Sequence, residues 1–447
     1  VGHCLGAAGS VEAVMCVKAI ERGIVPPTAG YTDEDVTLMR EKAGNFDFVP
    51  NKGKQRKVEY VQSNNYAFGG NNASIIYAKE GAPRKLAEPN GERVFVTGFG
   101  IVSPLGNTAE EYAANVNAGA AAKRCETCGD YVSSVGKEDF DAVGIKLNFY
   151  RKLDKLSQMT CVAGKRALAN AGIEVTEDNA RKIGIVAGTS DGPQTDIANF
   201  QKGIIANGTQ TGSAFLFPNT VYNAAPGYFS IAAGVKGYNV TLSNGAASGI
   251  AAVAFGSRVL GTTQNDVILA IGADEDSETV HMLYEKTGAI AAGMTPGDGA
   301  TVVVLERGSS VRARGAKVYA EVLGSGFAHC PTEFGKYGCA GKLKEAIDLA
   351  LAESGVKAED IGTVVTCANG VKSLTEAENE ALAAFCKAKK VSVKDICGEG
   401  RAASSALSVA HAAMMLDGEI AGGEGEYALV LGASVGGSYN AVVLKKA

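Results

Sequence analysis

The most informative segment for the fold is Val96-Thr97-Gly98-Phe99-Gly100-Ile101-Val102-Ser103-Pro104-Leu105-Gly106-Asn107. Its apolar first half predicts a strand that begins at Val94, and the Pro and Gly after it predict a turn. Strands and helices then alternate toward the C-terminus. The expected strands are 94–97, 183–187, 239–242, 266–271, 301–306 and 363–367, and the expected helices are 108–118, 156–171, 248–260 and 342–354. Strands separated by helices indicate an α/β sheet that is largely covered.

Composition limits the functions that this chain can have. Its 447 residues are enough for two or three domains, and 46% of them are hydrophobic, as in soluble globular proteins. The net charge is −5 and no basic run stands out, so we expect no nucleic-acid partner. No apolar stretch is long enough to span a membrane, and no signal peptide opens the sequence. Cysteines scattered through apolar segments indicate free thiols and a cytoplasmic protein.

Two short motifs could suggest a bound metal or nucleotide. Cys125 and Cys128 form a lone Cys-x-x-Cys pair, which is weak evidence for zinc or redox chemistry. We interpret them as two unrelated loop thiols and expect no metal. The Gly98-Phe99-Gly100 sequence after a strand could indicate a dinucleotide site, but Pro104 stands where the required helix should run. We therefore expect no nucleotide.

The sequence before Val94 has a different organisation. A helix rich in small residues is expected over 6–23, and Pro26-Pro27 ends it. Strands are expected over 58–62 and 73–78, with a Gly- and Asn-rich turn between them. Residues 80–92 are rich in Pro, Gly and charge without periodicity. This divides the chain into a first piece, 1–79, a linker, 80–92, and a second piece, 93–447.

The two pieces resemble each other internally. Gly2-His3-Cys4-Leu5-Gly6 and its helix resemble Gly400-Arg401-Ala402-Ala403-Ser404 and the helix after that. Ala67-Phe68-Gly69-Gly70-Asn71-Asn72-Ala73 resembles Ser434-Val435-Gly436-Gly437-Ser438-Tyr439-Asn440, and a strand follows each. The first piece thus corresponds to the C-terminal end of a unit whose complete copy is the second piece. Because the sequence opens at Val1 without Met, we expect a fragment, a processed product or one part of a split subunit.

Four motifs, in order, resemble those of β-ketoacyl-acyl-carrier-protein synthases, the ketosynthases. Residues 2–13 resemble the motif of their second catalytic histidine, and residues 63–72 resemble their Gly-Phe-Gly-Gly-Thr-Asn gating loop. Residues 96–107 resemble their first strand and turn, and residues 296–300 another of their loops. The resemblance implies a thiolase-like α/β fold. In that fold two similar βαβαβαββ halves form a layered α-β-α-β-α sandwich.

The resemblance also implies a chemistry. Ketosynthases use a Cys-His-His triad, in which the Cys carries the acyl chain and the two His stabilise an enolate. His3 resembles the second catalytic His, and Phe68, Gly69 and Gly70 resemble the gate at the malonyl pocket. The matching Cys and first His would lie upstream of Val1.

The second piece lacks this triad. Ala246 stands at the position of the nucleophile, Cys367 opens a loop that has no first His, and Arg401 replaces the second His. A methyl group cannot form a thioester, and a guanidinium cannot act as a base near neutral pH. Chain-length factors of type II polyketide synthases have this pattern, although they usually carry Gln where this chain has Ala246.

Other candidate residues carry weaker signals. Phe200, Ile204 and Phe217 fall in a region that borders the substrate tunnel in related subunits, although ordinary packing explains them equally well. His281, His329 and His411 match no catalytic position.

The resemblance implies a ketosynthase/chain-length-factor complex that performs iterative decarboxylative Claisen condensation of malonyl units. The acyltransferase activity is expected of the complex, and this chain alone is expected to be inactive. Expected partners are the Cys-bearing remainder of the ketosynthase, in a heterodimer or higher oligomer, and acyl carrier protein. The phosphopantetheine arm of the carrier protein would deliver substrate without another cofactor. Two alternatives remain: a fatty-acid-type synthase with an inert scaffold half, and a non-enzymatic pseudoketosynthase that binds carrier protein.

Overall fold

The computed structural model describes residues 2–42, 44–67, 70–83, 91–333 and 335–447. The chain divides into two compact units, of which the first runs to Ala87 and the second begins at Glu88. That boundary lies inside the segment 80–92, which the sequence marks as a linker. Among the residues described, no helix combines the length and the apolar character needed to cross a bilayer.

The second unit is built on a ten-stranded mixed sheet. Its order, within the described residues, is β12-β11-β13-β14-β10-β5-β9-β8-β6-β7. The strands are β5 (Val94–Val102), β6 (Ile183–Gly188), β7 (Asn239–Leu242), β8 (Val267–Asp274), β9 (Gly299–Arg307), β10 (Ala320–His329), β11 (Ile361–Val365), β12 (Lys389–Val391), β13 (Tyr427–Ser434) and β14 (Ser438–Lys446). Each half of this sheet holds five strands that are consecutive in the sequence, arranged in the same order. The expected duplication is confirmed at the level of topology.

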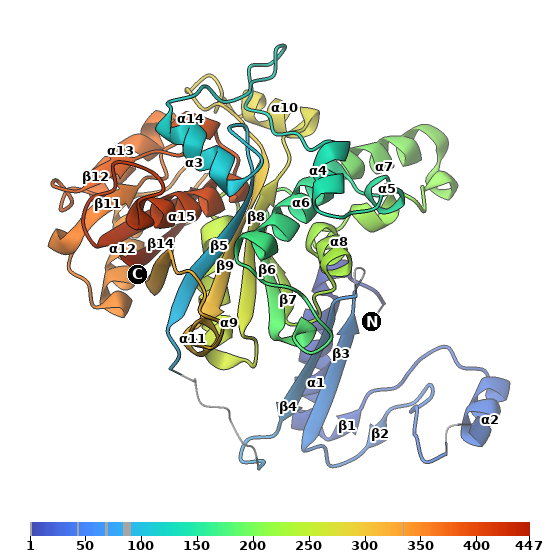
Figure 1. Ribbon diagram of the computed structural model, residues 1–447. Coiled ribbons are helices and arrows are strands. Elements are labelled where there is room, and N and C mark those ends of the chain that lie inside the picture. Colours follow the sequence, from blue (N-terminus) through green and yellow to red (C-terminus); the bar gives the residue numbers. More distant parts are fainter. Residues whose placement is uncertain (1, 43, 68–69, 84–90, 334) are drawn as a thin grey trace. The chain divides into compact units, whose positions relative to one another are not determined.

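Helices separate and cover the two halves of the sheet (Figure 1). The buried helices α9 (Ser248–Thr262) and α15 (Ala402–Asp417) pack on each other and on strands of both halves. On the first half lie α6 (Lys155–Asn170) and α8 (Ala224–Ala233), and on the second lie α12 (Ala340–Ser354) and α13 (Lys372–Ala381). The expected α-β-α-β-α layering is confirmed. The remaining helices are α3 (Ala109–Asn117), α4 (Lys137–Ala142), α5 (Leu147–Tyr150), α7 (Gln194–Asn207), α10 (Glu278–Lys286), α11 (Gly308–Arg314) and α14 (Lys394–Cys397).

The Gly-x-Gly pattern of β5 has a structural explanation. A Cβ at Gly100 would collide with the backbone oxygen of Ala163 on α6, so only glycine lets the helix lie this close to the strand. The equivalent strand β10 carries the same pattern, and there a Cβ at Gly326 would collide with the backbone oxygen of Ala346 on α12. The motif that resembles a nucleotide fingerprint is therefore a packing device that occurs once in each half.

The first unit is a helix on a hairpin. It contains a short 3-10 turn η1 (Leu5–Ala7), α1 (Ala8–Arg22), β1 (Ile24–Val25), α2 (Asp33–Lys42), β2 (Lys54–Gln55), β3 (Tyr60–Tyr66) and β4 (Asn72–Ala78). β3 and β4 pair in antiparallel register, and α1 packs on both. The Asn65 side chain on β3 donates to the Glu12 carboxylate on α1 at 3.0 Å. This order matches α15-β13-β14, as the internal repeat predicts.

Candidate functional site

The two buried helices each begin after a short turn, which joins α9 to strand β7 and α15 to helix α14. The turn before α9 runs from β7 through Gly245, whose φ of +63° suits glycine. Ala246 follows and is buried. The Ser434 hydroxyl, at the end of β13, accepts the Ala247 N–H at 2.9 Å and donates to the Asn244 carbonyl at 2.6 Å. The strand-turn-helix geometry that suits a nucleophile is thus present and held by hydrogen bonds, but it presents a methyl group.

The second turn presents Arg401, directly before α15. The Ala402 N–H donates to the Asp274 carboxylate at 2.9 Å, and Asp274 ends β8 as Ser434 ends β13. Each buried helix therefore has its first turn capped by a polar side chain from a strand of the opposite half. Arg401 itself has a φ of +53°, a backbone conformation rare for a residue with a side chain.

The Arg401 side chain is wholly buried and makes one hydrogen bond and one ion pair, while its Nε and Nη1 have no hydrogen-bond partner among the described residues. Its Nη2 donates to the Glu275 carbonyl at 2.6 Å, and its Nε lies 3.0 Å from Oδ2 of Asp191. The ring of Tyr284 lies 5.9 Å from the guanidinium carbon. The guanidinium thus occupies the interior with partners drawn from the chain itself.

Electrostatics keep Arg401 charged. Burial alone lowers the pKa of a guanidinium, but Tyr284, Asp274 and Asp191 raise the pKa of Arg401 above its usual value. Burial raises the pKa of Asp274 to about 6, although Arg401 acts in the opposite direction. A guanidinium in this setting releases no proton near neutral pH, so it cannot act as a base.

The loop after β11 directs Asn369, and not Cys367, toward the buried polar groups near Arg401. Cys367 lies in the apolar cluster under α12 and α13, and its N–H donates to the Glu378 carboxylate. Asn369 is the polar residue of the loop, and its amide donates to the Tyr337 hydroxyl at 2.7 Å and to Glu399 at 2.9 Å. Cys367, the residue expected from the motif, thus lies in the core, and Asn369, which was not predicted, is the residue that joins these buried polar groups. The Asn369-Gly370 pair could have indicated a turn at this position, because Asn-Gly is typical of tight turns and Gly370 has a φ of +91°.

Glu399 links Asn369 to a second buried charge. Lys394 donates to Glu399 at 2.8 Å, and both side chains are almost completely buried. Burial raises the pKa of a carboxyl, but Lys394 and the hydrogen bond from Asn369 leave the pKa of Glu399 below its usual value. Glu399 also accepts the Arg401 N–H at 2.9 Å. The region that would hold a triad is therefore filled by ion pairs and hydrogen bonds.

Some expected site residues lie in the first unit. His3 is exposed and lies just before η1, and Gly70 is exposed in the turn between β3 and β4. Phe68 and Gly69 lie outside the described residues. His3 and Gly70 therefore belong to the helix-and-hairpin unit, whereas Ala246, Cys367 and Arg401 belong to the other.

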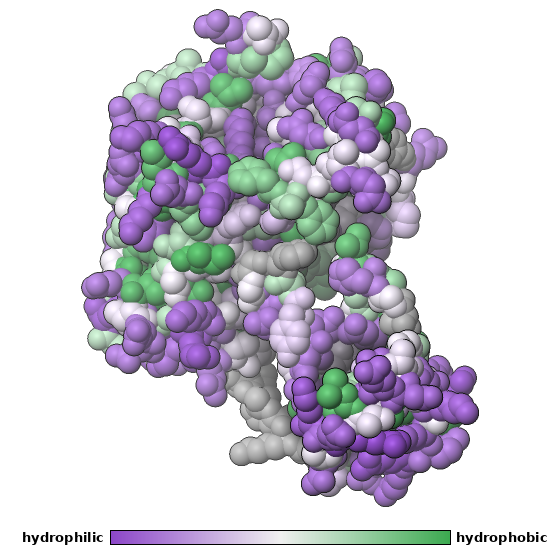
Figure 2. Space-filling model, turned by 90° about the vertical axis from the view of Figure 1, so that its right-hand side faces the viewer, coloured by the Kyte–Doolittle hydropathy of each residue, from purple (hydrophilic) through white to green (hydrophobic). Residues whose placement is uncertain are grey.

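The expected tunnel residues lie together at the surface of the second unit. Phe200 on α7 and Phe217 on the 3-10 turn η4 (Phe217–Asn219) have ring centroids 5.8 Å apart. Phe200 and Ile204 are half-buried, and Phe217 is 40% exposed. Exposed apolar side chains continue along this region at Ile205, Phe215, Tyr222 and Ile231. Figure 2 views the molecule from this side and shows hydrophobic residues between hydrophilic ones.

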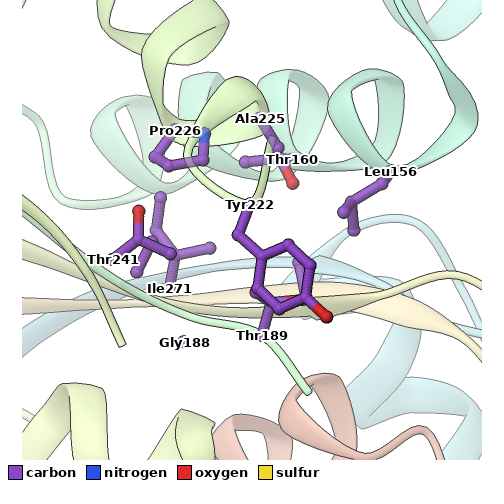
Figure 3. Close-up of a pocket in the computed structure, with 11 residues that line it drawn as sticks. Leu156, Thr160, Gly188, Thr189, Tyr222, Ala225, Pro226, Thr241 and Ile271 are labelled. Carbon is purple, nitrogen blue, oxygen red and sulfur yellow. The ribbon is translucent and has the colours of Figure 1, made fainter. Parts of the chain in front are cut away.

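A cavity of about 10 Å³ lies between α6, α8 and the first half of the sheet. Figure 3 shows Tyr222 among the side chains of Leu156, Thr160 and Thr189 that line it. That volume holds about one water molecule, so it has no room for an acyl chain.

Comparisons with known proteins agree with this geometry. Residues 91–310 match the family model of the beta-ketoacyl synthase N-terminal domain, and residues 1–32 and 319–422 match the model of the C-terminal domain. The C-terminal model thus matches sequence in both units.

Similar sequences include a 3-oxoacyl-acyl-carrier-protein synthase 2 of Vibrio cholerae, 30% identical over 61% of this chain and 72% of that protein. The tetracenomycin polyketide synthase ketoacyl synthase beta subunit of Streptomyces glaucescens is 30% identical over 72% of this chain and 85% of that protein.

Solved structures share the fold. The ishigamide ketosynthase/chain length factor superposes with a TM-score of 0.69 at 22% identity, covering 80% of this chain and 99% of that one. A ketosynthase in complex with a type II polyketide synthase acyl-carrier protein gives a TM-score of 0.66 at 19% identity, covering 80% of this chain and all of that one.

Proposed function

Because the chain belongs to the beta-ketoacyl synthase family, we propose that its second unit is the non-catalytic, chain-length-setting member of a type II polyketide condensing pair. One observation carries the proposal: a buried, ion-paired Arg401 and a methyl at Ala246 stand where the triad would be. Without a thiol the unit forms no acyl-enzyme, and with a fixed guanidinium it has no neutral imidazole for the enolate.

The first unit has a different part in this proposal. His3 would donate a hydrogen bond to the malonyl thioester oxygen in the active site of the Cys-bearing subunit. Loss of carbon dioxide from malonyl carrier protein leaves an enolate, which His3 would stabilise. The enolate carbon then attacks the acyl-Cys thioester, a carbon–carbon bond forms and the Cys thiolate leaves. Phosphopantetheine carries the extended chain.

The exposed apolar surface of α7, η4 and α8 supports a partner subunit in the complex. Large exposed apolar side chains that gather on one side of a monomer mark interaction sites. Phe200, Ile204 and Phe217 lie in that surface, where they would border a tunnel shared with the partner. The carrier protein is the second partner that we propose.

Product analysis of a reconstituted complex tests the proposal. Phe200→Ala in the second unit should shift the products toward longer chains, because it removes a ring from the end of the tunnel. Phe327→Ala is the control, since Phe327 is an exposed phenylalanine on β10, outside the surface of α7, η4 and α8, and should leave the products unchanged. An unchanged product distribution with Phe200→Ala would contradict a role in chain length.

A second candidate is a fatty-acid-type synthase in which this unit is only a scaffold. The identity of 30% to the Vibrio cholerae synthase favours it. Under that function the complex would make single 3-oxoacyl products, whereas a polyketide pair makes chains extended several times without reduction. Mass spectrometry of the carrier-bound products separates the two.

A further inference from the structure

The Cys-x-x-Cys motif forms a compact turn in the structure. The Cys125 N–H donates to the Asp130 carbonyl at 2.8 Å, and the Gly129 N–H donates to the Cys125 carbonyl at 3.0 Å. Gly129 has a φ of +80°, which closes the turn. The Cys128 N–H points at Cys125 Sγ at 3.5 Å, and the two thiols interact with each other. The turn therefore directs two sulfur atoms to one point and places an N–H donor against one of them.

Two further donor groups meet the Cys128 thiol, whereas the Cys125 thiol interacts with Cys128 and lies outside this group of close donor atoms. Asp130 is buried, and its Oδ2 shares a short hydrogen bond with Nδ1 of His281 on α10. Donor atoms of Cys128, Asp130 and His281 all lie within 4.8 Å of one another. The Tyr131 N–H donates to the Pro296 carbonyl at 2.9 Å, which anchors the turn to the neighbouring loop. The four side chains come from two separate segments, the turn and α10.

Two carboxyl groups lie close together in this cluster. Asp276, just before α10, interacts with Asp130, and its Oδ1 is buried without a hydrogen-bond partner among the described residues. Arg401, the nearby guanidinium, is already paired with Asp191. Two carboxyl groups and two thiols thus share one imidazole. A bound cation would balance them.

We propose that Cys125, Cys128, Asp130 and His281 bind one zinc ion. Two sulfur atoms, one imidazole nitrogen and one carboxylate oxygen form a set of four ligands suited to tetrahedral Zn²⁺, and thiolates disfavour Mg²⁺ and Ca²⁺. The metal takes the place of the proton between Asp130 and His281, and both thiols release their protons on binding. With four protein ligands the site is structural. It ties the turn to α10 beside Asp276 and the Arg401 network.

Metal titration of the purified full chain tests the site. After chelator treatment, the chain should bind one equivalent of Zn²⁺ in competition with a chromophoric chelator. Co²⁺ in its place should give thiolate-to-cobalt charge-transfer bands and the d–d bands of a tetrahedral site. The double variant Cys125→Ser/Cys128→Ser should lose the equivalent. Asp130→Asn should keep the charge-transfer bands and weaken affinity, because a neutral amide replaces an anionic ligand.

The chain offers a matched control. Cys330 and Cys339 are a second pair of interacting thiols outside this cluster, so Cys330→Ser/Cys339→Ser should keep the full equivalent of metal. Loss of metal in this control, or binding unaffected by Cys125→Ser/Cys128→Ser, would overturn the proposal. Absence of stoichiometric binding, or a Cys125–Cys128 disulfide in the intact mass of freshly purified protein, would also overturn it. These readouts need no condensing activity and are independent of the proposed function.

Discussion

The segments α15-β13-β14 and α1-β3-β4 have the same order of elements but differ in burial. Every residue from 402 to 416 of α15 is buried, whereas in α1 only Ala8 and Ala19 are. β13 is buried along almost its whole length, whereas β4 is exposed at all but one position. The shared sequence pattern thus specifies a local helix and hairpin. Burial depends on the strands and the second helix that surround α15.

The two helices also begin differently. α15 begins directly after Arg401, because Asp274 of a neighbouring strand accepts the first free N–H. α1 begins at Ala8, after a 3-10 turn, and within the described part of the chain no side chain caps its first turn. The position of His3 relative to its helix therefore differs from that of Arg401. The comparison indicates that strand ends outside the motif fix where such a helix starts.

The largest expected effect concerns the stability of the buried segment. Arg401→Met should lower the free energy of unfolding by about 3–5 kcal/mol, because it leaves Asp191 and Asp274 without their buried cation. Denaturant unfolding of the full chain measures this. Arg181→Met is the control, since Arg181 is exposed and its replacement should cost about 0.5 kcal/mol or less. A loss no larger than that of the control would show that the network does not stabilise the fold.

A slightly smaller effect is expected for His3, in the exposed segment before α1, and it concerns the rate of condensation. In the complete condensing complex, His3→Ala should slow elongation about 100- to 1000-fold, the contribution of one oxyanion donor. Loading of the acyl group onto the partner Cys should be unaffected. Cys4→Ala controls for local disturbance. An undiminished condensation rate would show that His3 is structural.

A third effect follows from the burial of α15 and depends on pH. Burial lowers the pKa of His411 to about 4, and its Nδ1 lies 2.9 Å from the Tyr112 hydroxyl. Above pH 6.5 His411 is neutral in both states. As pH falls from about 6.5 to 4, only the unfolded chain takes up this proton, so about 3 kcal/mol of stability is lost.

The variant His411→Gln isolates this contribution. Its unfolding free energy should fall less steeply than that of the wild type between pH 6.5 and 4, since glutamine does not titrate. Unfolding curves at several pH values measure the difference. Equal slopes in the two proteins would contradict the assignment to His411.

For the last variant, Ala246→Cys, we expect no effect on chain extension. Ala246→Cys, in a complex whose authentic Cys has been removed, should not restore chain extension, because Asn369 and Arg401 supply no imidazole. The introduced thiol lies near the N-terminus of α9, which favours a thiolate, so alkylation is expected. Liquid chromatography and mass spectrometry of carrier-bound products test this. Recovery of extended products would mean that the second unit is a dormant synthase.

Periodicity and turn residues were sufficient to predict most of the fold. The strand 239–242 and the start of the helix at Ser248 agree with the structure, because a Gly-rich turn separates the two apolar runs. The strand expected over 363–367 ends earlier, at Val365, since Cys367 already bonds to Glu378. The Gly-x-Gly pattern of β10 was not predicted to be a packing contact. The sequence around a glycine does not show whether a helix crosses the strand there or the chain turns. Only the structure places Ala346 over Gly326.

The candidate site was less predictable, because its contacts are non-local. The replacement of a histidine by Arg401 is readable from a motif, but the acids that hold the guanidinium come from distant strand ends. Asp191 follows β6 and Asp274 ends β8. In the same way, the sequence around Cys125 and Cys128 indicates two sulfur ligands only. The fold brings His281 to Cys128 and Asp130.

The buried guanidinium also limits the single substitutions by which this unit could acquire a catalytic triad. A single change of Arg401 to histidine would place a weak base where a permanent charge now balances Asp191 and Asp274. A single change of either acid would leave the guanidinium short of partners. A first step at Arg401 or at one of its acids therefore passes through a less stable protein. In the proposed non-catalytic unit, these ion pairs therefore oppose the replacement of Arg401 by histidine unless the paired acids change with it.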